Sequence, residues 1–132
     1  MSSFHFLAVG LGAALGAWGR WLLGLALNPL AQGIPLGTLA ANLIGAYLAG
    51  VAVGFFHFHA DLPLALKLLV ITGFLGGLTT FSSFSAETMD RFLSNRTTQA
   101  LILIGLHLAG SLCMTWLGLL TVGATRIWGR QA

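Results

Sequence analysis

The sequence predicts an all-α integral membrane protein, with four transmembrane helices that form a single domain over residues 1–132. Composition is the first reason, because 57% of the residues are hydrophobic and only 7% are charged. A soluble domain is usually about one quarter Asp, Glu, Lys and Arg, so these charges are too few to cover a water-exposed surface. The second reason is that four apolar stretches are each long enough to cross a bilayer, which takes roughly 20 residues.

The four predicted spans follow one another with short breaks. They cover residues 4–27, 36–58, 62–92 and 99–125. Residues that end or interrupt helices mark the gaps between them: Asn28, Pro29, Pro35, His59, Asp61, Pro63, Ser94 and Asn95. Such short connections imply that successive helices are antiparallel neighbours. The eighteen glycines suit close packing of helices within a membrane.

The third span is expected to be a broken helix. It contains Gly76 and Gly77, followed by a run of threonines and serines that begins at Thr79, and such a run makes a poor continuous helix. Irregular backbone at membrane depth is tolerated only where it is buried in protein or lines a cavity. Freed carbonyl groups at such breaks are how many membrane proteins build ion sites. The alternative is a kink that packs against a neighbouring helix and has no further role.

The distribution of basic residues gives no preferred orientation. With four helices, the N-terminus, the second connection and the C-terminus share one side of the membrane. The two sides then carry three basic residues each: Lys67, Arg126 and Arg130 on one side, and Arg20, Arg91 and Arg96 on the other. A tie leaves the positive-inside rule nothing to act on. We therefore expect an antiparallel, dual-topology dimer, although a slight bias that counting misses could still fix one orientation.

Polar residues form two stripes within the apolar spans. Thr38 and Asn42 are four residues apart in the second span, and His107, Ser111 and Thr115 repeat that spacing in the fourth. Residues at this spacing share one face of a helix, and polar groups inside a bilayer often mark function. A single Ser or Thr is more often a helix–helix contact. The stripes are neutral hydrogen-bonding groups, so together they indicate a pathway for a small ion.

Phe81 and Phe84 lie within the polar run of the third span, three residues apart. Core packing explains most phenylalanine pairs, but these two are surrounded by hydroxyl side chains. An aromatic ring has a positive edge, which can meet an anion without trapping it.

Two charged residues have roles that the sequence leaves open. Arg20 either anchors the first helix at the headgroups or attracts anions, and the role of Glu87 is not decided.

Several function classes are excluded. The six basic residues are scattered along the chain and form no nucleic-acid footprint. No catalytic triad, zinc spacing or phosphate loop can be assembled, so we expect no enzyme. Two rivals remain: a small multidrug-type four-helix transporter, and a membrane subunit that conducts nothing. The transporter class needs a carboxylate in its first helix, where this chain has Arg20 instead.

Three motifs of this chain closely resemble the CrcB/Fluc fluoride channels. They are Gly16-x-x-x-Arg20, Gly37-Thr38-x-x-x-Asn42-Leu43, and Gly76-Gly77-Leu78-Thr79-Thr80-Phe81-Ser82-Ser83-Phe84-Ser85-x-Glu87. The last is long and specific, and the likeness in length and helix count covers essentially the whole chain.

The resemblance implies a passive fluoride-selective channel in the bacterial inner membrane, which exports cytoplasmic fluoride through two pores of an antiparallel homodimer. Phe81 and Phe84 would form a box of ring edges, and Asn42 would donate its amide to the ion. The hydroxyl partners along the route would be those of Thr38, Ser82, Ser111 and Thr115. The backbone carbonyls of Gly76 and Thr79 from both chains would hold a structural sodium ion at the dimer axis.

Overall fold

The computed structural model describes residues 3–31 and 33–123, and all of its regular elements are helical. In chain order they are α1 (Ser3–Leu27), the 3-10 turn η1 (Asn28–Leu30), α2 (Leu36–Phe58), α3 (Leu64–Lys67), the π-helix η2 (Leu68–Leu75), α4 (Gly76–Leu78), α5 (Phe81–Leu93) and α6 (Thr97–Thr121). Arg126, Arg130 and the end of the predicted fourth span lie outside the described residues.

The four predicted spans are confirmed by the length and hydropathy of the helices. Helical segments long and apolar enough to cross a membrane run over Ser3–Leu30, Leu36–Phe58, Leu64–Leu93 and Thr97–Thr121. Large apolar side chains such as Leu11, Trp18 and Leu112 are exposed, as expected of surfaces that face lipid or another protein rather than water. The chain is therefore a multi-pass membrane protein.

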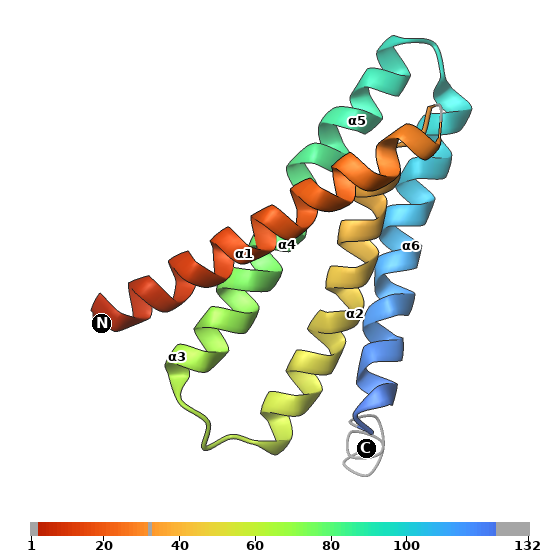
Figure 1. Ribbon diagram of the computed structural model, residues 1–132. Coiled ribbons are helices and arrows are strands. Elements are labelled where there is room, and N and C mark those ends of the chain that lie inside the picture. The colour runs from red at the N-terminus through yellow and green to blue at the C-terminus, as the bar shows by residue number, and fades with distance from the viewer. Residues whose placement is uncertain (1–2, 32, 124–132) are drawn as a thin grey trace.

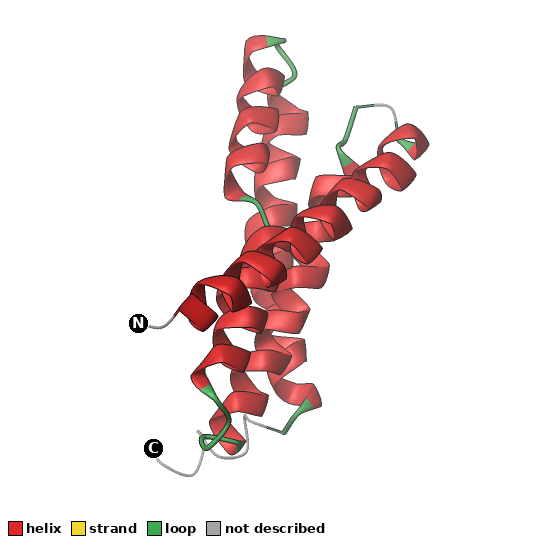
Figure 2. Cartoon of the chain, turned by 60° about the vertical axis from the view of Figure 1, so that its left-hand side comes forward, coloured by secondary structure: helices red, strands yellow, loops and turns green. Residues whose placement is uncertain are grey.

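The helices pack as two pairs (Figure 1). α2 and α6 run side by side along most of their length, while α1 crosses the molecule and packs on η2 and α4. α5 packs mainly against α6 and contacts α2 only at a few points. Turning the molecule shows α1 lying across the other helices, with its N-terminal end projecting to one side (Figure 2).

Glycines allow the helix backbones to approach closely. A Cβ atom on Gly12 would overlap the carbonyl oxygen of Leu69, and one on Gly16 would overlap that of Phe74. Glycines 50 and 118 meet the facing backbones of α6 and α2 in the same way. Small residues at helix contacts are typical of membrane proteins, because van der Waals packing drives helix association there. These contacts fix α1 against the third span and α2 against α6.

The third span changes form along its length. Its first half is largely a π-helix, η2, which the sequence analysis did not foresee. Gly76, expected to start the irregular segment, is helical with φ −63° and ψ −34°. The residues that leave helical conformation are Thr79, with ψ 153°, and Thr80, with φ −151° and ψ 113°. The Thr79 amide still donates to the Leu75 carbonyl (3.0 Å), which explains why the helix continues past the glycines.

Candidate functional site

A partly open cavity of about 390 Å³ lies where α2, α5 and α6 meet the extended residues of the third span. Its walls combine Asn42 of the first predicted polar stripe and the whole of the second stripe with the phenylalanine pair. The lining residues are Asn42, Ala46, Thr79, Thr80, Phe81, Phe84, His107, Leu108, Ser111, Leu112 and Thr115. Residues from three separate spans therefore meet around one space.

Asn42 is the centre of the hydrogen bonding in this cavity. Its Oδ1 accepts from the backbone N–H of Thr80 (2.7 Å), and its Nδ2 donates to the Thr80 carbonyl (3.0 Å). The same Nδ2 lies 3.0 Å from Nδ1 of His107. The backbone N–H can only donate, so the atom facing it must be the amide oxygen. These hydrogen bonds fix the orientation of the Asn42 side chain, which is buried within the membrane-spanning region.

The orientation of Asn42 also fixes the tautomer of His107. Because Nδ2 of Asn42 is a donor, the facing Nδ1 of His107 must accept, and the hydrogen of a neutral ring is then on Nε2. His107 is only 4% exposed, and its Nε2 is buried without a hydrogen-bond partner among the described residues. A buried, unpaired donor is unusual in a protein. It leaves an N–H group on a cavity-lining residue for an acceptor from elsewhere.

The two phenylalanines are in contact but occupy different surroundings. Their ring centroids are 5.4 Å apart at an interplanar angle of 65°, which is an edge-to-face arrangement. Phe84 is 6% exposed and packs against the His107 ring, with the two ring centroids 4.5 Å apart, whereas Phe81 is 72% exposed. Phe84 thus belongs to the core of the protomer, and Phe81 projects from the rim of the cavity.

The stripe on α6 continues along the cavity wall. The hydroxyl of Thr115 donates to the carbonyls of Ala46 (3.1 Å) and Ser111 (3.0 Å), so its hydrogen is already shared between two acceptors. The Ser111 hydroxyl has no hydrogen bond within the described part of the chain, so its donor is unused. Ser111 is therefore better placed than Thr115 to donate to an anion.

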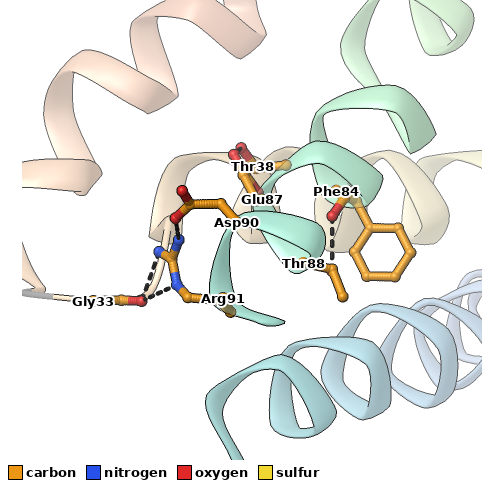
Figure 3. Close-up of polar contacts among 7 residues, drawn as sticks. All are labelled: Gly33, Thr38, Phe84, Glu87, Thr88, Asp90 and Arg91. Carbon is orange, nitrogen blue, oxygen red and sulfur yellow. Dashed lines mark hydrogen bonds and ion pairs between the residues drawn. The ribbon is translucent and has the colours of Figure 1, made fainter. Parts of the chain in front are cut away.

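Thr38 is not among the residues that line the cavity, and it lies beside Glu87 of α5 (Figure 3). Its hydroxyl donates to Oε1 of Glu87 (2.6 Å), and Glu87 follows Phe84 by about one turn of α5. The second carboxylate oxygen, Oε2, is buried without a partner among the described residues. The sequence left the role of Glu87 open, and the structure places it opposite Thr38.

Besides Thr38, two further predicted pathway residues do not line the cavity. Ser82 is exposed, with its hydroxyl 3.2 Å from that of Thr80. Arg20 is half-buried on α1, and α1 contributes nothing to the cavity wall. Thr80, the backbone partner of Asn42, was not predicted from the sequence. The available signal was Asn42 itself, because an amide at membrane depth needs hydrogen-bond partners.

The carbonyls of Gly76 and Thr79 lose the amides that a continuous helix would supply. The amide four residues after Gly76 belongs to Thr80, and it donates to Asn42. The amide four residues after Thr79 belongs to Ser83, and it donates to the hydroxyl of Thr80 (3.1 Å), which caps α5. The described residues contain no group of three His, Cys, Asp or Glu that could hold a metal ion.

Comparison with known proteins places the chain in a family. The family described as "CrcB-like protein, Camphor Resistance (CrcB)" matches residues 7–119. The chain is 65% identical over 128 residues to the fluoride-specific ion channel FluC of Dechloromonas aromatica, covering 97% of this chain and 95% of that protein. It is 58% identical over 122 residues to the protein of the same name from Ralstonia pickettii, covering 92% and 97%. With a match of this extent, the chain belongs to the CrcB family.

Proposed function

We propose that this chain is a fluoride-specific ion channel, the activity for which its relatives in Dechloromonas and Ralstonia are named. The observation that carries the proposal is the buried Nε2–H of His107, which has no hydrogen-bond partner among the described residues. His107 lines a cavity that is also lined by a phenylalanine pair and by Ser111. These groups are neutral and offer hydrogen to an acceptor. Among ions that cross membranes, a small anion requires such an environment.

The cavity chemistry suits fluoride in two respects. A small anion gives up strong hydration on entering a low-dielectric space, which costs many kcal/mol unless other donors replace the water. Ring edges and single N–H or O–H donors replace part of that hydration, but they are weak enough to let the ion leave. A fixed positive charge at the same place would hold the ion too tightly, and no Lys or Arg is among the described residues that line the cavity.

The conducting unit in this proposal is an antiparallel homodimer with two pores. Two features support it: the three-against-three tie of basic residues, and the 72% exposure of Phe81 at the rim of a partly open cavity. In a protomer alone, most of this large ring stays exposed despite its edge-to-face contact with Phe84. A second, inverted copy would cover the open side and complete each pathway with residues from both chains.

Gly76 and Thr79 fit a structural sodium ion at the dimer axis. The amides that would normally bond their carbonyls donate to side chains instead. Carbonyl oxygens are the ligands that a hard cation prefers. When bound, the ion would neutralise the repulsion between carbonyls of two facing chains and would offset the charge of fluoride. The broken form of the third span is then what supplies these ligands.

Export in this proposal is passive and takes place across the bacterial inner membrane. Fluoride accumulates in acidified cells because its neutral acid enters and ionises inside, so a leak for the anion is sufficient. The multidrug-transporter alternative needs a carboxylate on the first helix, and residues 3–27 contain no Asp or Glu. A subunit that conducts nothing would not need a buried donor, without a partner in the described part of the chain, on a residue that lines a cavity.

Efflux from liposomes tests the function directly. Purified protein is reconstituted with a potassium fluoride gradient, and efflux is started with valinomycin and followed with a fluoride electrode. Rapid fluoride release is expected, with no chloride release from matched vesicles. Protein-free vesicles and vesicles holding the Phe81→Ile variant serve as controls. Equal release of both halides, or none of either, would remove the proposal.

A further inference from the structure

A two-point contact joins α5 to the start of α2 (Figure 3). The guanidinium of Arg91 donates through Nε (2.9 Å) and Nη2 (2.7 Å) to the carbonyl oxygen of Gly33. One turn earlier on α5, Glu87 accepts the hydroxyl hydrogen of Thr38 (2.6 Å). Side chains one helical turn apart on α5 thus hold two points of the chain that lie five residues apart. We call these bonds the Arg91–Gly33 and Glu87–Thr38 contacts.

The Arg91–Gly33 contact is built into the protein rather than a chance surface pair. The Arg91 side chain is only 14% exposed, and both of its donors meet a single carbonyl oxygen. Its third nitrogen, Nη1, bonds Asp90 (2.8 Å), whose side chain is 66% exposed. Gly33 has φ +106°, a conformation that favours glycine. The carbonyl direction therefore depends on the residue type at this position.

Little else connects α5 to α2. α5 packs mainly on α6, with few contacts to α2. At the start of α2, the amide of Gly37 donates to the side chain of Asn28 (2.8 Å), so the lead into α2 is tied to the end of α1 as well. The spacing between Thr38 and α5 is thus set by a few polar contacts, and Arg91 provides two of the hydrogen bonds.

We propose that Arg91 is a positioning residue for the pathway. By holding the Gly33 carbonyl, it keeps the Thr38 hydroxyl against Glu87. Asn42, which lines the cavity, lies one turn further along α2 than Thr38. Arg91 acts through the backbone of residues 33–38 and does not contact the ion. For its functional readout, this inference rests on the proposed fluoride conduction.

Three substitutions separate hydrogen bonding from charge. Arg91→Met removes every donor, Arg91→Gln keeps a donor without charge, and Arg96→Met removes one positive charge on the same side without touching the contact. We expect Arg91→Met to lower fluoride efflux about tenfold, a factor that corresponds to about 1.4 kcal/mol. Arg91→Gln should retain most of the efflux, and Arg96→Met should match the wild type. A loss shared by the Gln and Arg96 variants would assign the effect to charge or topology and overturn the proposal.

A double-mutant cycle and hydrogen exchange complete the test. If Arg91 acts through Thr38, the double variant Arg91→Met with Thr38→Val conducts no less than Thr38→Val alone; multiplicative losses contradict the proposal. Amide hydrogen exchange over residues 33–42 should be faster in Arg91→Met and unchanged in Arg96→Met. This measurement needs no ion transport, so it decides the positioning role even if the wild-type protein fails to conduct fluoride. Unchanged exchange in Arg91→Met overturns the proposal.

Discussion

Asn42 on α2 bonds both backbone groups of Thr80, with its Oδ1 2.7 Å from the Thr80 nitrogen and its Nδ2 3.0 Å from the Thr80 oxygen. A side chain from another span thereby replaces the partners that a continuous third helix would have given this residue. The exchange keeps Thr80 extended at membrane depth without unpaired polar groups, which would each cost several kcal/mol. It also orients His107, so one amide links the backbone of the third span to the cavity-lining stripe of α6.

The first prediction tests this link with Asn42→Asp, which preserves shape and changes one donor group into an acceptor. Asp still accepts from the Thr80 N–H, but its second oxygen faces the Thr80 carbonyl and the unprotonated nitrogen of His107. Unmade buried bonds cost about 1–3 kcal/mol each, so fluoride efflux should fall at least about tenfold. Asn42→Asp protein that unfolds at the same temperature as the wild type and conducts at the wild-type rate would show that the amide donors are dispensable.

The second prediction concerns the His107 tautomer. Nitrogen-15 NMR of histidine-labelled protein should show one neutral ring protonated on Nε2, because Nδ1 accepts from Asn42. His107→Gln, which can carry a donor near the Nε2 position, should conduct better than His107→Leu, which cannot. An Nδ1-protonated ring would mean that the cavity offers fluoride an acceptor instead of a donor, and the proposed role would be lost.

The sequence predicted the four spans because their signal is additive: each apolar residue raises the mean hydropathy of a whole window. The stripe of His107, Ser111 and Thr115 was equally accessible, since helical spacing alone places these residues on one face. The position where the third span leaves helical form was less accessible. It depends on Asn42 and Thr80, which are 38 residues apart in the chain, and no local propensity encodes that pairing.

The contacts of Thr38, Ser82 and Arg20 also could not be predicted from spacing. Thr38 shares a helix with Asn42, yet its hydroxyl meets Glu87 outside the cavity. Its direction depends on how α5 sits beside α2, which in turn depends on where the third span breaks. The π-helix η2 was not predicted from the sequence of Leu68–Leu75. Each of these features follows from tertiary packing, which outweighs local preference.

The third prediction uses the different exposure of the two phenylalanines. Phe81→Ile retains bulk and apolarity but removes the ring edge, and Phe81 is 72% exposed, so the protomer should remain as stable as the wild type. Fluoride efflux should nevertheless fall about tenfold or more. Phe84→Ile should lose stability as well, because Phe84 is buried against His107. Thermal unfolding in detergent, compared with efflux, separates the two effects.

The fourth prediction concerns helix packing. Gly16→Ala places a methyl group against the carbonyl oxygen of Phe74 and the amide nitrogen of Leu78, which are backbone atoms that cannot rotate away. Overpacking of this kind typically costs about 1–3 kcal/mol, so the unfolding temperature should drop. Gly10→Ala is the matched control, because a Cβ there meets nothing within 4 Å. Ala has a higher helix propensity than Gly, so propensity alone would not lower stability in either variant. Similar losses in both variants would show that the close contact of Gly16 with η2 and α4 is not the cause.

The last prediction concerns the ion proposed between Gly76 and Thr79 of two chains. Their carbonyls lack the amides of Thr80 and Ser83, which donate to side chains, and two inverted protomers would bring such oxygens together. Oxygens that face one another repel unless a cation lies between them, and without nearby carboxylates sodium is favoured over a divalent metal. Replacing sodium with N-methyl-D-glucamine on both sides should therefore weaken the dimer and fluoride efflux together, and adding sodium back should restore both. Chelators of divalent metals should have no effect. Dimers that persist and conduct after exhaustive sodium removal would show that the protein itself satisfies these carbonyls.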